Sequence, residues 1–547
     1  MERKAFYGES IHWHSKFVIG FNDPFHPQSC DRYLRTGEQQ FFAAQDPTPS
    51  VESYLDMIRE LGVDFYMHHA IPCEQETERM IDILTEAKLP FILGNEFYSI
   101  NRVYAPGTGR GELSPGLVQK ARTSPYFMGL LYDETEHVQL HSSQYGEGSG
   151  YQWADPHGKS AGRIEADICE AIRAASQKFG VPLYSEHVFP VMYHTFSRAG
   201  MRVCPKVLKE EFQPLQLAAA MGAAKQYGQP LGICVDLWGM DVGHWFTRLW
   251  GLPAHSPEEF KSGLQLAYYM APSMMFVENM DALLRNTEKG FCYTEFGEIF
   301  LDFVHNFVQE HPLPYTHLDV ACDIAVIRAD DACIAKSGNF DGSGLFGSKD
   351  LLPDARTNSF IDVMYTLLHK TCSHEALTYH KSEFDMVPLG KYPRTEETLR
   401  TLPLAHGVPK EEETLCHPIF HPLNQALVFD QYVRPEDIGD ARLLVVCGSR
   451  LGPSTVETVA ERVRAGALAV IPAYFEAEFA GVLEESGRGG WAVVPDFTGP
   501  VFQAAVEPYL GKKDEWKIRF KSGILTVKNP SGDGKTLTFH WEEELSL

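Results

Sequence analysis

Carboxyl side chains stand at the ends of several apolar stretches of this 547-residue sequence. Glu134 comes soon after the run Phe127–Tyr132, and Asp236 and Glu278 each close a short apolar segment of their own. Two carboxyl groups on opposite sides of a glycosidic bond can cleave it, one as proton donor and the other as nucleophile or base. Separations of about 5–5.5 Å give retention of configuration, and about 6.5–9.5 Å give inversion. We therefore predict Glu134 as the acid, with Asp236 or Glu278 as the second catalytic carboxylate.

The sequence around Glu134 favours its role as a proton donor. Asp133 and Glu136 place further carboxyl groups close to it. Like charges raise one another's pKa, and a raised pKa keeps an acid protonated near neutral pH. Helix capping or an ion pair with arginine is the structural alternative for Asp133 and Glu136.

Further polar and aromatic side chains close to predicted strand ends could hold a sugar. Aromatic rings can stack on a sugar ring, and carboxylates and imidazoles can bind its hydroxyl groups. The predicted substrate-binding residues are His12, His14, Glu96, Asp133, Glu186, His187, Trp238 and Trp245. For Glu186 and His187 a buried structural pair is the alternative, and clustered tryptophans are also common in cores. We predict no metal ligand and no cofactor.

Strands and helices alternate over the first 315 residues, which predicts an α/β fold, a (β/α)8 TIM barrel. The expected strands lie in the region Phe6–Phe21 and at Asp64–Ala70, Pro90–Ser99, Phe127–Tyr132, Pro182–His187, Met201–Val207, Pro230–Trp238 and Ser273–Asn279. Side chains at the carboxyl ends of barrel strands face the catalytic mouth, so this fold would gather the candidate acids.

The sixth strand, Met201–Val207, is the least regular, and it decides the order of the later strands. With it, Asp236 ends the seventh strand and Glu278 the eighth. Without it, Glu278 ends the seventh. The chain from Asp236 to Asp323 has room for a helix, a strand and a closing helix, whereas the chain from Glu278 has room for one helix. The spacing therefore favours Asp236 as the end of the seventh strand.

Beyond Pro314 the pattern changes to short strands separated by helices. The strands are expected at Asp323–Arg328, Ala426–Phe429, Ala441–Val446 and Ala467–Ile471, and the helices include Ser359–His369 and Ser454–Ala465. This pattern predicts a flavodoxin-like (amidotransferase-like) α/β domain, without the glycine-rich loops of nucleotide sites. The tail Trp516–Leu547 predicts a small C-terminal β domain. The predicted domain ranges are 1–315, 316–512 and 513–547.

A barrel followed by a flavodoxin-like domain and a small β domain resembles the trimeric β-galactosidases of glycoside hydrolase family 42. It also resembles family 164, and both belong to retaining-glycosidase clan A. In that clan an acid/base glutamate, usually after asparagine, ends the fourth strand, and a nucleophile glutamate ends the seventh. The resemblance implies that Glu134 is the acid/base, with Asp133 where the clan has asparagine. Asp236 has the expected strand position and Glu278 the expected residue type, so both stay candidate nucleophiles.

The resemblance also implies an activity and an assembly. The expected activity is that of a glycosidase that removes a terminal sugar from an oligosaccharide or glycoside. The expected partner is this carbohydrate substrate, and the protein is expected to form a homo-oligomer, a trimer, through its second domain.

Two other functions stay open. His12 and His14 form an H-x-H pattern in the region of the first strand, which resembles the metal-binding start of the amidohydrolase superfamily. His187 could supply a further ligand, so a metal-dependent amidohydrolase-like hydrolase is one alternative. A carbohydrate-binding barrel without catalysis is the other, because a fold alone does not decide function.

The composition restricts the partners and the compartment. A net charge of −25 disfavours binding to nucleic acid or to anionic membranes. No apolar run approaches the roughly 18–20 residues of a membrane span, and the amino terminus lacks the apolar segment of a signal peptide. The 11 cysteines form no C-x-x-C pair, which favours reduced thiols. We expect a cytoplasmic protein.

Overall fold

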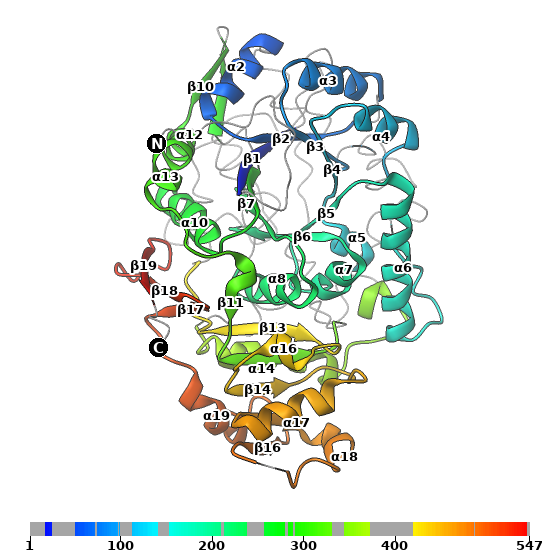
Figure 1. Ribbon diagram of the computed structural model, residues 1–547, viewed down its shortest axis with the longest axis vertical. Coiled ribbons are helices and arrows are strands. Elements are labelled where there is room, and N and C mark those ends of the chain that lie inside the picture. The colour runs from blue at the N-terminus through cyan, green and yellow to red at the C-terminus, as the bar shows by residue number, and fades with distance from the viewer. Residues whose placement is uncertain are drawn as a thin grey trace, which may run out of the picture.

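The computed structural model describes residues 17–23, 50–71, 74–96, 98, 112–140, 152–208, 213–237, 256–278, 283–287, 290–330, 344–371, 419–485 and 487–543. A closed barrel forms one end of the elongated molecule, and an open parallel sheet forms the other (Figure 1). A small antiparallel sheet lies beside the junction of the two.

Eight parallel strands close the barrel in the order of the sequence. They are β1 (Val18–Asp23), β2 (Phe65–His69), β3 (Phe91–Gly94), β4 (Phe127–Tyr132), β5 (Leu183–His187), β6 (Arg202–Val207), β7 (Gly232–Asp236) and β8 (Met274–Glu278). β6 pairs with β5 and with β7, which confirms the sixth strand. β8 pairs with β1 and closes the barrel, so Asp236 ends the seventh strand and Glu278 the eighth.

Helices surround the barrel (Figure 1). They include α2 (Val51–Leu61), α3 (Glu74–Glu86), α4 (Pro115–Arg122), α5 (Thr135–Leu140), α6 (Ala161–Phe179), α7 (Tyr193–Ala199), α8 (Gln213–Tyr227), α10 (Pro257–Tyr269) and α12 (Glu295–Asp302). Serine side chains cap four of them by accepting a backbone N–H of the first turn, and these are Ser50, Ser114, Ser160 and Ser256. A hairpin that the sequence did not predict, β9 (Leu284–Thr287) and β10 (Gly290–Tyr293), follows β8.

The side chains inside the barrel follow the alternation of the strands. Leu131, Tyr184, Cys204, Cys234 and Phe276 belong to one buried apolar cluster, and each comes from a different strand. Alternate residues of a strand point to the same side. The residues two positions further along these strands are Asp133, Glu186, Lys206, Asp236 and Glu278. The polar groups therefore form the next layer, at the carboxyl ends of the strands.

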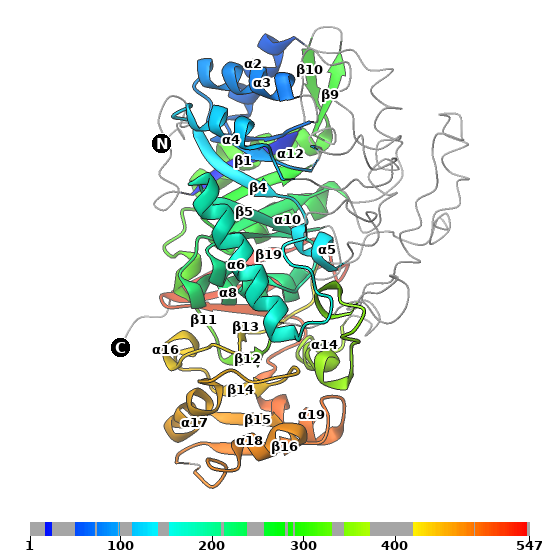
Figure 2. The ribbon, with the colours of Figure 1, turned by 90° about the vertical axis from the view of Figure 1, so that its right-hand side faces the viewer.

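The open sheet has the strand order β13-β12-β14-β15-β16, with every pair parallel. Its strands are β12 (Ile324–Arg328), β13 (Ala426–Asp430), β14 (Leu443–Val446), β15 (Leu468–Pro472) and β16 (Gly490–Val494). In sequence order this is 2-1-3-4-5, the flavodoxin-like order, so the predicted fold class is confirmed. Helices α16 (Pro435–Ile438) and α17 (Thr455–Ala465) cover one face, and α14 (Ala355–Leu367) and α19 (Pro500–Val506) the other (Figure 2).

The barrel and the flavodoxin-like sheet pack tightly against each other. Helix α8 of the barrel lies along β13 (Figure 1), and a Cβ atom at Gly222 would collide with the carbonyl oxygen of Val428. The small sheet has the order β11-β17-β18-β19 and combines β11 (Val320–Ala321) with β17 (Trp516–Phe520), β18 (Gly523–Lys528) and β19 (Thr538–Glu543). Its strands thus come from both sides of the flavodoxin-like sheet in the sequence. The domain boundaries at 315/316 and 512/513 stay predictions.

The first strand lies at the end of the predicted region Phe6–Phe21 and extends two residues beyond it. β1 is Val18–Asp23, and its carboxyl end carries Asn22 and Asp23. His12 and His14 precede this strand in the sequence. Their own positions, like those of Trp238 and Trp245, lie outside the described residues.

Candidate active site

A cluster of acidic side chains surrounds one lysine at the carboxyl ends of β4 to β8. The Nζ atom of Lys206 lies 2.6 Å from Glu278 Oε2, 3.1 Å from Glu134 Oε1 and 3.2 Å from Asp236 Oδ2. It also lies 3.3 Å from Glu186 Oε1 and 3.7 Å from Asp133 Oδ1. The structure therefore brings together all three predicted catalytic residues and two of the predicted substrate-binding residues.

Lys206 is the central cation of this cluster. Burial on its own lowers the pKa of a lysine, but Glu186, Glu278 and the other acids outweigh burial and raise the pKa of Lys206 well above its usual value. The side chain is therefore a protonated ammonium at neutral pH. An ammonium cannot attack a carbonyl group, so this lysine is not suited to Schiff-base chemistry.

Glu134 has an unusual backbone. Its φ of 42° lies in the left-handed region, which non-glycine residues rarely occupy and which costs free energy. It follows Asp133, whose backbone N–H donates a hydrogen bond of 2.9 Å to Asn95 Oδ1 at the end of β3. Strained residues held by their surroundings cluster at functional sites, which is consistent with a catalytic role for Glu134.

Asp236 and Glu278 lie side by side, because they are register partners of the neighbouring strands β7 and β8. Their exposure differs. Glu134 is 6% exposed and Glu278 is 4% exposed, whereas Asp236 is fully buried. Glu134 and Glu278 therefore retain a small exposed surface that Asp236 lacks.

Glu186 has a raised pKa within the cluster. Burial raises its pKa well above the usual value, and Glu278 and Asp133 raise it further against the opposing effect of Lys206. One ligand atom from each of Glu186, Cys234 and Glu278 lies within 4.8 Å of the other two, a spacing that could hold a metal ion. The ammonium of Lys206 already contacts both carboxylates of this group, so the arrangement fits a resident lysine better than a metal.

Glu136 and His187 are fully buried next to the acidic cluster. Glu136 Oε1 accepts hydrogen bonds from the backbone N–H groups of Val188 (2.7 Å) and Phe189 (3.1 Å). Burial first and Glu134 second raise the pKa of Glu136 to about 8. Burial lowers the pKa of His187 to about 3, so its ring is neutral.

The structure does not bring His187 to the acidic cluster. Its ring stacks on Tyr193 at 4.2 Å between centroids and meets the edge of Phe196 at 5.2 Å. Because neighbouring residues of a strand point to opposite sides, His187 faces helix α7 while Glu186 faces the barrel interior. Glu96 lies after β3, with Oε2 3.8 Å from His69 Nε2.

The sequence reasoning missed Lys206, although it placed the strand that carries it. The alternation Arg202, Cys204, Lys206 along β6 puts a lysine in the same layer as the acids. That spacing was the signal that could have identified it.

The metal-dependent alternative is not supported by the described residues. β1 does not end in the H-x-H pattern, and His187 points away from the barrel interior. The inward-facing side chains of β6 are Arg202, Cys204 and Lys206, without a histidine.

Comparisons with known proteins give structural similarity alone. No protein-family model and no curated protein matches the chain. Among solved structures, the exo-β-1,4-mannosidase of Opitutaceae bacterium strain TAV5 is 10% identical, covers 96% of this chain and 86% of its own, and has a TM-score of 0.39. A family 98 glycoside hydrolase from Streptococcus pneumoniae TIGR4 is 9% identical, covers 96% and 75%, and has a TM-score of 0.42.

A family 42 β-galactosidase from G. stearothermophilus, as a catalytic mutant, is 8% identical, covers 86% of this chain and 72% of its own, and has a TM-score of 0.42. At these identities and TM-scores the similarity does not bear on the reaction. The function is therefore inferred from the site itself.

Proposed function

We propose that the protein is a retaining glycoside hydrolase that removes a terminal sugar from an oligosaccharide or glycoside. The observation that carries this proposal is the distance of two carboxylates from one nitrogen. Glu134 Oε1 lies 3.1 Å and Glu278 Oε2 2.6 Å from Lys206 Nζ, so these two oxygens cannot be farther apart than the sum of these distances. That sum is below about 6.5 Å, where the range of inverting enzymes begins.

We assign Glu134 as the acid/base and Glu278 as the nucleophile. Both are more exposed than Asp236, so a sugar that enters from the mouth meets them first. Glu278 also has the closest contact with the ammonium of Lys206, which favours the ionised form that a nucleophile needs. Asp236, which is also in contact with Lys206, would support the pair from the neighbouring strand β7.

In the first step, a carboxylate oxygen of Glu278 bonds to the anomeric carbon while the glycosidic C–O bond breaks. The carboxylic acid of Glu134 gives its proton to the departing oxygen. In the second step, the Glu134 carboxylate takes a proton from water, whose oxygen displaces Glu278 and releases the sugar. Lys206 stabilises the carboxylate that Glu278 becomes again.

Other features bear on the size of the substrate, the need for a cofactor, the oligomeric state and the location of the protein. The acidic cluster is almost fully buried, which favours a single terminal sugar over the interior of a long chain. We propose no metal and no cofactor, and no partner other than the carbohydrate and further copies of the chain. A trimer is proposed from the family 42 resemblance, and a cytoplasmic location from the scattered cysteines. No described helix is long and apolar enough to cross a bilayer.

A panel of aryl glycosides tests the activity, and three variants test the roles. Glu134→Gln should lose at least about 100-fold in kcat on substrates with poor leaving groups and less on activated ones, because only the former need the proton. Glu278→Gly should be inactive until azide is added, and should then form a glycosyl azide of inverted configuration.

Asp236→Gly is the matched control for the nucleophile. It should not be rescued by azide, and rescue of this variant instead of Glu278→Gly would exchange the two roles. If the wild-type protein binds sugars but cleaves no glycoside in the panel, the barrel is a binding module and the proposal is wrong.

A further inference from the structure

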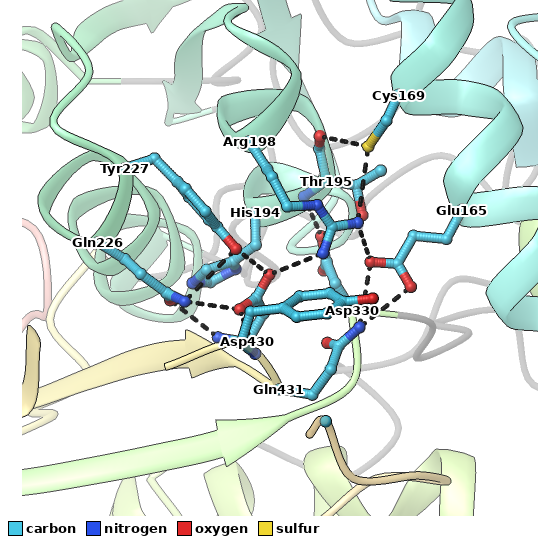
Figure 3. Close-up of polar contacts among 12 residues, drawn as sticks. Glu165, Cys169, His194, Thr195, Arg198, Gln226, Tyr227, Asp330, Asp430 and Gln431 are labelled. Atoms are coloured by element: carbon cyan, nitrogen blue, oxygen red, sulfur yellow. Dashed lines mark hydrogen bonds and ion pairs between the residues drawn. The ribbon is translucent and has the colours of Figure 1, made fainter. Parts of the chain in front are cut away.

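The connection between β5 and β6 is attached to the flavodoxin-like sheet. It runs from Glu186 and His187 through helix α7 to Lys206, so it joins two members of the acidic cluster. Figure 3 shows α7 side chains pointing toward Asp330 and Asp430, which follow or end strands of the other sheet. The second sheet is therefore in direct contact with an element of the site.

Asp330 makes the central contacts of this attachment. It is fully buried. Its Oδ1 accepts the backbone N–H of Met192 (3.0 Å), and its Oδ2 accepts the backbone N–H (2.9 Å) and the hydroxyl (3.0 Å) of Thr195. These N–H groups belong to the start of α7, where no side chain of the helix itself acts as a cap. Asp330 thus caps α7 from another domain, and its negative charge suits the positive end of the helix.

Arg328 strengthens the same attachment. Its Nη2 donates to Asp330 Oδ1 (3.0 Å) and to the carbonyl oxygen of Pro190 (3.1 Å), which lies just before α7. The guanidinium group also lies over the ring of Phe360, 4.1 Å from its centroid. Two residues at the end of β12 therefore hold three successive parts of the connection.

Helix α7 also contacts the residues that directly follow Glu186 at the end of β5. Tyr193, the first residue of α7, stacks on His187 and donates from its hydroxyl to Gln216 Oε1 (2.7 Å). Gln216 Nε2 in turn donates to the carbonyl oxygen of Val188 (2.7 Å), whose N–H group is bound by Glu136. A displacement of α7 would therefore move the residues directly after Glu186.

We propose that Asp330 is a positioning residue, which sets the placement of Glu186 and Lys206 in the barrel by fixing the start of α7. Its effect on turnover rests on the proposed function, whereas its effect on the placement of the two side chains does not. The flavodoxin-like sheet is then a part of the site's framework as well as a neighbouring domain.

The variant Asp330→Asn tests this role with little change in shape. An amide can still accept at one position, but its NH2 group would face the donors of Thr195 or Met192. Hydrogen exchange of residues 188–199 should become at least about 10-fold faster, since a buried charged acceptor is lost. The carboxyl signal of Glu186 in carbon-13 spectra, identified with Glu186→Gln, should shift its titration midpoint. On a glycoside that the wild type cleaves, kcat should fall about 10-fold or more while KM changes less than about 2-fold.

Tyr227→Phe is the matched control. It removes the hydroxyl that donates to Asp430 Oδ2 (2.6 Å), an oxygen that also pairs with Arg198 in the last turn of α7, so it perturbs the same interface without touching the Asp330 cap at the start of the helix (Figure 3). It should leave the exchange of 188–195 and the Glu186 signal unchanged. If Asp330→Asn lowers stability as Tyr227→Phe does and changes neither of these readouts, Asp330 is structural only and the proposal is overturned.

Two further outcomes are distinguishable. Should Asp330→Asn fail to fold, Thr195→Val removes a single hydrogen bond to Asp330 and is judged by the same exchange and spectral criteria. If the wild type cleaves no glycoside, the proposed function fails, while the exchange and carboxyl signals still decide the role of Asp330.

Discussion

Replacing Lys206 by methionine tests whether this lysine is the cation that makes the acidic cluster stable. Methionine has a similar length and no charge, so the change removes the ammonium and keeps most of the volume. Five carboxyl groups would remain around the site, and Asp133, Glu186 and Asp236 are nearly or fully buried. Their charges would repel one another without compensation.

The cost follows from the burial of the pairs. Removing one partner of a buried ion pair destabilises a protein by about 3–5 kcal/mol, because the remaining charge stays desolvated. Lys206→Met should therefore lose about 3–5 kcal/mol in the free energy of unfolding near pH 7.5. The cluster can reduce this loss by taking up protons. The deficit should fall by at least about half near pH 4.5, because carboxyl groups that have lost the ammonium take up protons as the pH falls.

The wild type should behave differently over the same range. The pKa of Lys206 is raised above its unfolded value of about 10.4, so its stabilisation is fully present below that pH. It is lost only when the pH rises through the folded pKa. The lysine therefore contributes equally to the free energy of unfolding of the wild type at pH 4.5 and 7.5. Any pH dependence of the difference in stability between wild type and Lys206→Met comes from the carboxyl groups of the variant.

Urea unfolding at pH 4.5 and 7.5, followed by circular dichroism, measures these differences. Lys225→Met is the control, since Lys225 is partly buried and donates to the carbonyl oxygen of Val320 (2.7 Å). It should lose about 0.5–1.5 kcal/mol, equally at both pH values. If Lys206→Met is as stable as the wild type at pH 7.5, or if its deficit does not depend on pH, the reasoning about the cluster is refuted.

Three further predictions concern the neighbours of the cluster. Glu136→Gln keeps an Oε1 that can accept from the N–H groups of Val188 and Phe189, and it removes the carboxyl group whose pKa is about 8. That pKa is raised above the unfolded value of about 4.3, so the free energy of unfolding of the wild type should fall by about 5 kcal/mol as the pH rises from 4.3 to 8. The free energy of unfolding of the variant, measured in urea, should depend less on pH over this range. His187→Phe should keep KM within about 2-fold, because the ring packs on Tyr193, whereas a 10-fold rise in KM would return His187 to the site. Chelators should leave turnover unchanged, and one zinc per chain with chelator-sensitive activity would instead favour the metal-dependent alternative.

Much of the fold could be predicted because its strands are short, apolar and evenly spaced. Phe127–Tyr132 and Met274–Glu278 are buried on both faces, as parallel strands are, so the sequence marks them clearly. The order of the later strands also followed from spacing, and β6 settled it. The first strand lies at the end of the region predicted for it, Phe6–Phe21, because its apolar residues are Val18, Ile19 and Phe21.

The central residue of the site could not be found from apolar patterns. β6 reads Arg202–Val207 with arginine and lysine at inward positions, so it departs from the pattern of a buried strand. It was the least certain strand for that reason, and the same departure is what places Lys206 among the acids. Local rules of sequence fail where a fold holds functional groups, so an irregular buried strand is a signal of a site.

The flavodoxin-like sheet shows how the two domains depend on each other. Ligands of such sheets bind at the carboxyl ends of the strands, at the point where the strand order reverses, here between β12 and β14. Arg328 and Asp330 lie at the end of β12, and their hydrogen bonds go to Pro190, Met192 and Thr195 of the barrel. The barrel thus contacts the flavodoxin-like sheet at the end of one of the two strands that flank this point. The same contacts fix the connection between Glu186 and Lys206, so the second sheet contributes to the site in the barrel.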